Sequence, residues 1–470
     1  MILPEVLAAA EQRQARRLTE LLDWLAIPSV SADPRRTADV GRAARWLASW
    51  QRARGAMVDL RPTRHGRDVV VARWPARPGA RQVVIYGHYD VQPAGAGWSS
   101  HPFRPVIRDG VIHARGANDD KGQLFAHLCA LDAWPGLLPA EVVVIAEGAE
   151  EVGSTGFAEV VHEVARQLRP VAVIVSDTER YDDGTPTVTI SQRGRLAATL
   201  TVDTGGTAVH AGRLGGAVVD PSLVLADALR ILHKELFTTS VPTPPSAVAR
   251  TDAAVRQAAR GRATVGAGLD ERVTLHGSIG VTRLVAGTGG AALPSRASAV
   301  LDLRLPPRSD PADVVRRARR LLMRCAPRGA RVQLHFTRGT PALDLTPDRL
   351  VRQAVDQACV AVHGRPPVYV RSGGTIPAVG VLSHALRIRP LLLGFGPPGG
   401  NAHGPDESLD IAGWAAAVRM SATLLWTLTR TLTRPIRGDP VPGSLRRDHH
   451  GEIRQLPCGE RPVQLEGEER

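Results

Sequence analysis

Apolar residues repeat with two periods along most of the chain, and both periods point to one layered fold. Helical spacing predicts helices over residues 4–26, 38–54, 121–133, 157–168 and 347–363. Short apolar runs predict buried strands at 69–73, 82–86, 142–146 and 171–175. Strands that alternate with helices across short loops are typical of an α/β layered sheet.

The pattern changes near residue 194. Beyond it, strands such as 196–202 and 297–303 alternate apolar and polar residues, and helices are expected at about 221–236 and 311–325. The expected order of strand, helix, strand, strand, helix, strand is typical of a compact α+β unit.

These patterns divide the chain into two interleaved domains and a tail. We expect a larger α/β domain made of residues 1–193 and 339–434, with an α+β domain of residues 194–338 inserted into it. Residues 435–470 are polar, charged and rich in Pro and Gly, so we expect a disordered tail there.

Composition narrows the class of protein. Apolar residues make up 43% of the 470 residues, which is enough for a well-buried core. The net charge of +13 raises the question of nucleic acid, but the arginines are scattered, without a basic run or interleaved aromatic residues. We therefore expect no nucleic-acid partner, although the positive field would help to attract an acidic substrate.

No segment predicts an oxidising compartment or a membrane. The four cysteines lack the spacing of a zinc clip or a redox pair. The N-terminus lacks the apolar stretch of a signal peptide, and no apolar run approaches the ~20 residues needed to cross a bilayer. We expect a soluble cytoplasmic protein with no membrane partner.

A histidine and an acid follow a predicted strand in the segment Gly87-His-Tyr-Asp-Val-Gln-Pro93. In extended backbone, His88 and Asp90 lie on the same face. A carboxylate beside an imidazole orients a metal-binding histidine and keeps it basic. Alone, the pair also fits a surface histidine beside an acid.

Two pairs of adjacent acids follow. Asp119 and Asp120 open a predicted helix, where a carboxylate could bridge two cations but where acids are also ordinary caps. Glu150 and Glu151 follow a buried strand, and adjacent carboxylates repel each other there unless a cation or a proton compensates. In the functional interpretation, Glu151 binds metal and Glu150 takes a proton from an attacking water.

Two more ligands complete the set. Asp177 ends an apolar strand, and the glycine-rich loop Gly399-Gly-Asn-Ala-His403 presents a histidine. The combined candidate ligands are His88, Asp119, Glu151, Asp177 and His403. Oxygen and imidazole ligands without sulfur suit a hydrolytic site with two divalent metal ions, Zn²⁺ or alternatively Mn²⁺ or Co²⁺.

With these motifs in this order, the chain resembles the M20 family of metallopeptidases over about residues 21–428. The matching segments are Gly87-His-Tyr-Asp-Val-Gln-Pro93, Asp119-Asp-Lys-Gly122, Glu147-Gly-Ala-Glu-Glu-Val-Gly-Ser154 and Arg371-Ser-Gly-Gly-Thr-Ile-Pro377. The first two and the last are most similar to the carnosinase-like dipeptidase branch. The resemblance implies a zinc-peptidase-like catalytic domain with a mixed central sheet. It also implies an inserted lid of four antiparallel strands and two helices, through which a homodimer forms.

The resemblance also implies how the metal ligands divide. One ion would bind His88, Asp119 and Asp177, and the second would bind Asp119, Glu151 and His403. The peptide between Asp119 and Asp120 would be cis. In this site Asp90 would orient His88, and Glu150 would be the general base.

Substrate contacts follow from the same resemblance. His210 is similar to a family histidine that reaches the partner's active site and stabilises the oxyanion, although a turn before a helix is the plain alternative. Arg304 is similar to an arginine that binds the substrate carboxylate, with Gly374 and Thr375 near the same group. Ala291 and the segment Thr337-Arg338-Gly339 depart from the dipeptidase pattern, which leaves the metal site intact but the identity of the substrate open.

The resulting hypothesis is a dinuclear metal-dependent hydrolase of dipeptides or short peptides. An N-acyl amino acid deacylase, of the acetylornithine deacetylase or succinyl-diaminopimelate desuccinylase type, uses the same metals and is the alternative. A non-catalytic protein on this scaffold would have lost a ligand or Glu150, and all of them are present.

Overall fold

The computed structural model describes residues 2–181, 184–237, 259–262, 268–287, 289–336 and 339–432. Thr337 and Arg338, and the tail 435–470 that was predicted to be disordered, lie outside these described residues.

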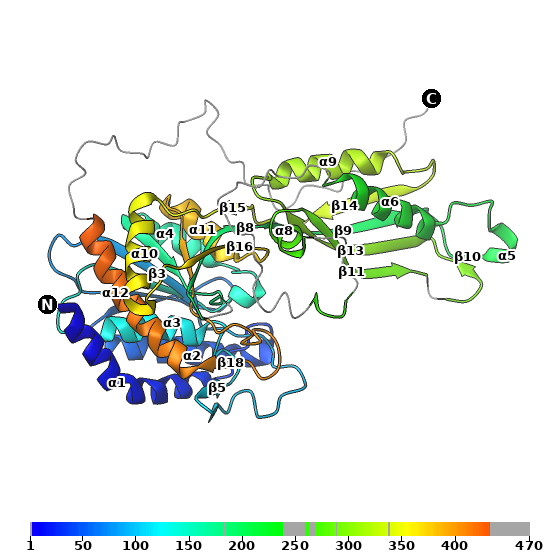
Figure 1. Cartoon of the computed structure of the whole chain (residues 1–470). Coiled ribbons are helices and arrows are strands. Elements are labelled where there is room, and N and C mark those ends of the chain that lie inside the picture. Colours follow the sequence, from blue (N-terminus) through cyan, green and yellow to red (C-terminus); the bar gives the residue numbers. More distant parts are fainter. Residues whose placement is uncertain are drawn as a thin grey trace, which may run out of the picture.

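A nine-stranded sheet forms the centre of the larger domain (Figure 1). Its order is β1 (Met57–Arg61), β2 (Val69–Trp74), β6 (Glu141–Glu147), β3 (Gln82–His88), β7 (Pro170–Val175), β17 (Leu391–Gly394), β8 (Thr187–Gln192) and β15 (Leu343–Asp344), with β16 (Val368–Ser372) also paired to β8. Strands β6, β3, β7 and β17 run parallel to one another, whereas β2 pairs antiparallel with both β1 and β6. Strand β8 pairs antiparallel with β17 and β15 but parallel with β16. The prediction of a mixed α/β sheet is therefore confirmed.

Helices cover both faces of this sheet because its inner strands are apolar on both sides. Val83 and Ile85 of β3 face the core under α1 (Ile2–Leu25), α2 (Thr37–Arg52), α3 (Lys121–Asp132), α10 (Arg349–His363) and α12 (Ile411–Leu432). Val84 and Tyr86 face the opposite core under α4 (Phe157–Ala165) and α11 (Pro377–Leu386). This alternation follows from the two-residue period of a strand.

Helix α12 is longer and more apolar than the sequence pattern predicted. Residues Ile411–Thr431 have the length and composition of a membrane-crossing helix, with a mean hydropathy of 1.2. However, 67% of that window is buried inside the protein, where α12 packs against α1, α3 and α10. Its apolar surface therefore has partners within the fold, and such burial is typical of a core helix.

A second sheet of four antiparallel strands projects from the first (Figure 1). Its order is β11 (Ser278–Ala286), β13 (Arg296–Leu305), β9 (Gly194–Asp203) and β14 (Arg331–Phe336). Helices α6 (Pro221–Glu235) and α9 (Pro311–Met323) cover one face, where Leu196, Ala198 and Leu200 of β9 are buried. Along the chain the elements run β9, α6, β11, β13, α9, β14, with the short helix α8 (Leu269–Thr274) before β11.

The far end of the second sheet carries a small projection. It consists of β10 (Val209–His210), which pairs with β12 (Ala292–Leu293), and the one-turn helix α5 (Ala211–Leu214). Figure 1 places β10 and α5 at the end of the molecule remote from the central sheet. A third, three-stranded sheet of β18 (Ser408–Asp410), β5 (Val111–His113) and β4 (Val106–Arg108) flanks the central sheet's domain.

The packing of the second domain predicts that two leucines contribute very differently to the free energy of unfolding. Leu200 is fully buried beneath the helices, whereas Leu223 on α6 is 68% exposed. Leu200→Ala should lower the free energy of unfolding by about 2–5 kcal/mol, because it leaves a cavity. Leu223→Ala should change it by less than about 0.5 kcal/mol. Urea unfolding followed by circular dichroism measures both, and equal losses would contradict this packing.

Candidate metal centre

The carboxyl ends of three neighbouring parallel strands meet at one edge of the central sheet. His88 is the last residue of β3, Glu147 is the last residue of β6, and Asp177 lies two residues beyond β7. Open α/β sheets usually bind ligands at this edge. Close packing there requires Gly87, because a Cβ at this position would lie 2.6 Å from Asp120 Oδ2.

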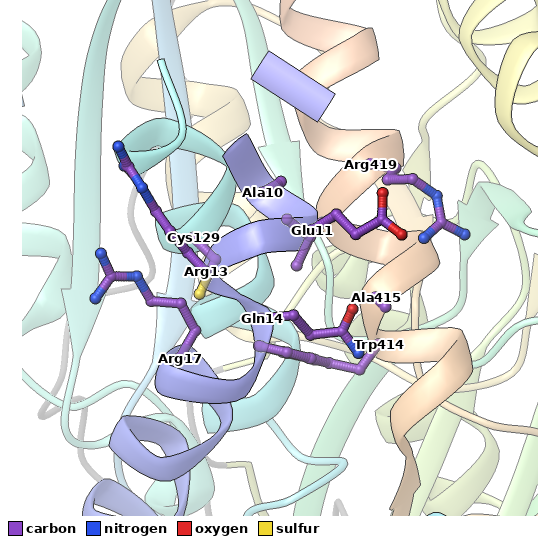
Figure 2. Close-up of a pocket in the computed structure, with 10 residues that line it drawn as sticks. Ala10, Glu11, Arg13, Gln14, Arg17, Cys129, Trp414, Ala415 and Arg419 are labelled. Carbon is purple, nitrogen blue, oxygen red and sulfur yellow. The ribbon is translucent and has the colours of Figure 1, made fainter. Parts of the chain in front are cut away.

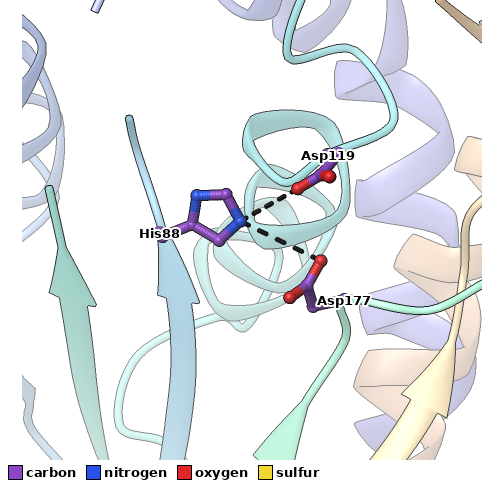
Figure 3. Close-up of side chains that lie close together, drawn as sticks. All are labelled: His88, Asp119 and Asp177. Carbon is purple, nitrogen blue, oxygen red and sulfur yellow. Dashed lines mark hydrogen bonds and ion pairs between the residues drawn. The ribbon is translucent and has the colours of Figure 1, made fainter. Parts of the chain in front are cut away.

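Three candidate ligands converge on one point in this edge (Figure 3). His88 Nε2 lies 3.0 Å from Asp119 Oδ1 and 3.9 Å from Asp177 Oδ1. The three ligand atoms lie within 4.8 Å of one another, which is close enough to surround a single ion.

A second triad lies beside the first. His403 Nε2 is 2.9 Å from Asp119 Oδ2 and 3.2 Å from Glu151 Oε2. These three ligand atoms also fall within 4.8 Å of one another. Asp119 therefore directs one carboxylate oxygen toward each triad. The Asp119–Asp120 peptide is cis, as the resemblance implied.

The electrostatics of this edge are dominated by buried like charges. Burial and the neighbouring charges of Glu151, Asp119 and Asp90 together raise the pKa of Glu150 to about 8, against the opposing charge of His88. Burial and the charge of Asp119 likewise raise the pKa of Asp177 well above its usual value. A bound cation would reverse both shifts, because it stabilises the ionised carboxylates.

The histidines respond to the same negative field. Burial opposes protonation of His88, but Asp119, Asp90 and Asp177 together raise its pKa well above the ordinary value. Hydrogen bonds to Asp119 and Glu151 raise the pKa of His403 to about 11. This cluster of oxygen and imidazole donors fits a hard or borderline divalent cation, as expected for zinc, manganese or cobalt.

Asp90 supports both the histidine and the two glutamates. His88 Nδ1 lies 3.0 Å from the Asp90 carbonyl oxygen and 3.4 Å from its carboxylate Oδ1. The same carboxylate accepts the backbone N–H groups of Glu150 and Glu151, at 3.2 and 3.1 Å. The carbonyl and the carboxylate of Asp90 both lie near His88 Nδ1, which fits the predicted orientation of His88 by Asp90. The contact between Asp90 and the loop of Glu150 and Glu151 was not predicted.

Gln92 contacts a candidate ligand, and the sequence did not suggest this contact. Its Nε2 donates to Glu151 Oε2 at 2.7 Å, the oxygen that faces His403. Gln92 therefore fixes the carboxylate of one candidate ligand. An amide two residues from Asp90 carries no signal of its own, and only the fold brings it there.

His127 lies behind the cluster. Its two ring nitrogens contact the hydroxyl oxygens of Ser176 and Ser421, at 2.8 and 2.7 Å. Burial lowers the pKa of His127 to about 3, so the ring is neutral. Because Ser176 precedes Asp177, this helix-borne imidazole supports the strand end that carries a candidate ligand.

The expected substrate residues gather where the two domains join. Arg304 lies at the end of β13 and contacts Asp302 Oδ1 at 2.7 Å. Thr375 donates to the carbonyl oxygen of Arg193, and Gly374 accompanies it in the same loop, with its N–H on Ser372. Burial and the nearby charge of Arg304 together lower the pKa of Arg193 to about 10.

The sequence pattern marked Arg193 only as a domain boundary. In the structure its side chain joins segments of both domains. Its guanidinium group donates to the carbonyl oxygens of Gly373 and His276. Arg193 and Arg304 therefore lie near each other beside Thr375, and we call these two arginines the cationic corner.

His210 is not brought to the metal cluster of its own chain. It lies in the projection at the far end of the second sheet (Figure 1), where its Nδ1 accepts the N–H of Gly212. Its strand partner is Ala292, beside the departing position Ala291.

A hollow between α1, α3 and α12 is separate from this site. None of its lining residues belongs to either triad (Figure 2). Arg13 and Arg17, on one side of it, donate to Asp132, and Trp414 lies along the opposite side.

The layered α/β fold and the two ligand triads at the carboxyl edge of its sheet define a metal-dependent hydrolase. The chain belongs to peptidase family M20/M25/M40, whose family model matches residues 84–427.

Several similar proteins are dipeptidases. The Cys-Gly metallodipeptidase dug1 of Schizosaccharomyces pombe is 26% identical, over 91% of this chain and 98% of the relative. The cysteinylglycine-S-conjugate dipeptidase of Corynebacterium striatum is also 26% identical, over 84% of this chain and 91% of the relative. The human beta-Ala-His dipeptidase is 32% identical over 49% of each chain.

Solved structures share the fold. Human carnosine dipeptidase 1 superposes with a TM-score of 0.76 at 21% identity, covering 92% of this chain and 99% of that one. The M20 family metallo-carboxypeptidase Sso-CP2 of Sulfolobus solfataricus gives a TM-score of 0.74 at 25% identity, covering 88% and 99%. The predicted membership of the M20 family is confirmed.

His127 predicts a pH dependence of stability. Its pKa is about 3 in the folded protein and about 6.5 in an unfolded chain. Between these values the unfolded chain binds the extra proton, so the free energy of unfolding decreases as the pH falls through that window. His127→Gln should lose less stability than the unsubstituted protein between about pH 6 and pH 4.

Urea titrations at each pH measure this difference. The exposed His65→Gln is the matched control and should follow the unsubstituted protein. Parallel pH profiles for His127→Gln and the unsubstituted protein would show that His127 is not buried in its neutral form.

Proposed function

We propose that this protein is a dinuclear metallohydrolase that cleaves the peptide bond of dipeptides or short peptides. The observation that carries the proposal is the position of Asp119, whose two carboxylate oxygens face His88 and His403 at 3.0 and 2.9 Å. A carboxylate shared in this way is the usual bridge between two hydrolytic metal ions.

The remaining ligands complete the two sites. His88 and Asp177 would hold one ion with Asp119, and Glu151 and His403 would hold the other, with Zn²⁺ as the first choice and Mn²⁺ or Co²⁺ as alternatives. Such ions polarise a carbonyl group and lower the pKa of water.

Glu150 is the proposed general base. It ligates neither ion in this scheme, and its backbone N–H is fixed by Asp90 at 3.2 Å. A carboxylate beside two cations would be ionised and would accept a proton from water, because the cations oppose the upward pKa shift that burial causes. The same group would then return the proton to the leaving amine.

The cationic corner of Arg304 and Arg193 is the proposed site for the substrate carboxylate, with Gly374 and Thr375 beside it. A guanidinium group binds a carboxylate with two hydrogen bonds, which would set the distance between the carboxylate and the scissile bond. The relatives' names, Cys-Gly and beta-Ala-His dipeptidase, favour a short peptide with a free carboxylate.

We also propose that the protein forms a homodimer through its second sheet. Strand β11 is one of the two edge strands of that sheet, and its Val281, Leu284 and Val285 are 48%, 60% and 42% exposed. An exposed apolar edge strand favours pairing with another chain. In a dimer, the projection that carries His210 would enter the partner's active site and stabilise the oxyanion there.

The base assignment predicts a separation of turnover from metal binding. Glu150→Gln should lower kcat by on the order of 10²–10⁴-fold, because the proton acceptor is lost, while two metal ions remain bound. Steady-state kinetics and metal analysis measure both quantities. Glu159→Gln on the surface of α4 is the control and should leave both unchanged. Near-normal turnover by Glu150→Gln would assign the base elsewhere.

A substrate panel tests the type of bond that is cleaved. Dipeptides such as Cys-Gly and beta-Ala-His should be hydrolysed, whereas N-acetyl and N-succinyl amino acids should not. Turnover of an acyl substrate without turnover of any dipeptide would instead support the N-acyl amino acid deacylase.

The dimer predicts complementation between two inactive variants. His210→Ala should lose rate and retain metal, and mixing it with Glu150→Ala should restore activity, because a mixed dimer contains one intact site. Activity assays after refolding the mixture provide the measurement. A mixture that stays as inactive as its components would rule out His210 acting in the partner's site.

A further inference from the structure

A buried ion pair joins the loops that carry the candidate ligands. Arg115 Nη1 donates to Glu407 Oε2 at 2.8 Å, and the two side chains are 1% and 0% exposed. Neither residue is a candidate ligand, and the mechanism above does not use them.

Glu407 accepts hydrogen bonds from the loop that leads to Asp119. Its Oε2 accepts the N–H of Gly116 at 3.0 Å, in addition to Arg115. Its Oε1 accepts the N–H groups of Asn118 and Asp119 at 2.8 and 2.9 Å. One carboxylate thus binds four donors, and one of them is the backbone of the bridging aspartate.

Arg115 extends the connection to the other ligand loops. Its Nη2 donates to the carbonyl oxygen of His403 at 3.2 Å and to that of Pro93 at 3.2 Å. The Pro93 carbonyl lies in the segment that follows His88. Residue His403 has a backbone φ of +64°, a conformation that side-chain-bearing residues rarely adopt, so its loop needs support of this kind.

We propose that Glu407 and Arg115 are positioning residues that fix the bridging carboxylate of Asp119 and the imidazole of His403 relative to each other. This inference rests on the proposed dinuclear site. The N–H groups of Asn118 and Asp119 are turned toward Glu407, and the buried carboxylate satisfies them. The Asp119 side chain is then held where its two oxygens face opposite triads.

Energetics favour a positioning role over a stabilising one. A buried ion pair gains little net stability, because desolvation offsets the attraction between the charges. The ion pair instead fixes directions: Glu407 accepts four hydrogen bonds from the segment 115–119, and Arg115 also donates to the carbonyl oxygens of Pro93 and His403. Outer groups of this kind set the orientation and the affinity of metal ligands.

Glu407→Gln tests the role with almost no change in shape. A glutamine side chain has one accepting oxygen and one donating NH₂ group. Its NH₂ group would therefore face another donor, either Arg115 or the N–H groups of the loop. We expect the affinity for Co²⁺ to fall about 10–100-fold, and the visible absorption of bound Co²⁺ to change as its ligand geometry changes. Titration of the full chain with Co²⁺, followed by absorption spectroscopy, measures both without any substrate.

Asp132→Asn is the matched control. Asp132 forms a buried ion pair with Arg17, on α3 and α1, with side chains 9% and 7% exposed. Removing that pair should lower the melting temperature but leave the affinity and the spectrum of Co²⁺ unchanged. A role of Glu407 in stability alone would make the two variants alike.

The outcomes separate this inference from the proposed function. If the unsubstituted protein binds no Co²⁺, the proposed dinuclear site is wrong. If it binds Co²⁺ and Glu407→Gln binds it with the same affinity and spectrum, the positioning role is wrong. If Glu407→Gln does not fold, Glu407→Asp decides in the same titration, because it keeps the charge but is too short to contact both Arg115 and Asp119.

Discussion

Like charges packed together at the carboxyl edge of the central sheet are the constraint on which the rest of the structure depends. The acids gathered there are Asp90, Asp119, Asp120, Glu147, Glu150, Glu151 and Asp177. Burial and mutual repulsion raise the pKa of Glu147 and Glu150 to about 8. A group of carboxylates like this is stable in its ionised form only if positive charge compensates it. Two divalent ions shared by Asp119 would supply that charge.

Hydrogen-bond donors of the chain itself also stabilise carboxylates around the candidate ligands. Asp90 accepts two N–H groups from the glutamate loop, Asp120 accepts the N–H of His88, and Glu407 accepts three N–H groups and a guanidinium. These contacts fix the carboxylates of Asp90, Asp120 and Glu407, and they connect loops that are distant in sequence. The parallel strands supply the frame, and the second domain adds the cationic corner at its junction with the first.

Much of this was predictable from the sequence, because strands and ligands carry local signals. The apolar runs at 82–86, 142–146 and 171–175 predicted strands, and β3, β6 and β7 contain them. Three of the candidate ligands, His88, Glu151 and Asp177, follow those predicted strands. The strands β8, β16 and β17 were not predicted, because polar residues interrupt the apolar runs of β8 and β16 and because β17 has only four residues. Gln92, Arg115, Arg193 and Glu407 were missed for a different reason. Their roles arise from contacts between distant segments, such as the one between Arg115 and Glu407, and a charged residue destined for the interior is indistinguishable in sequence from a surface one.

The central claim is that Asp119 joins two metal ions at this edge. Anomalous X-ray diffraction from crystals of the zinc-loaded protein tests it most directly. We predict two zinc peaks, one contacted by His88 and Asp177, the other by Glu151 and His403, with Asp119 contacting both. A single peak, or peaks that do not share Asp119, would contradict the claim.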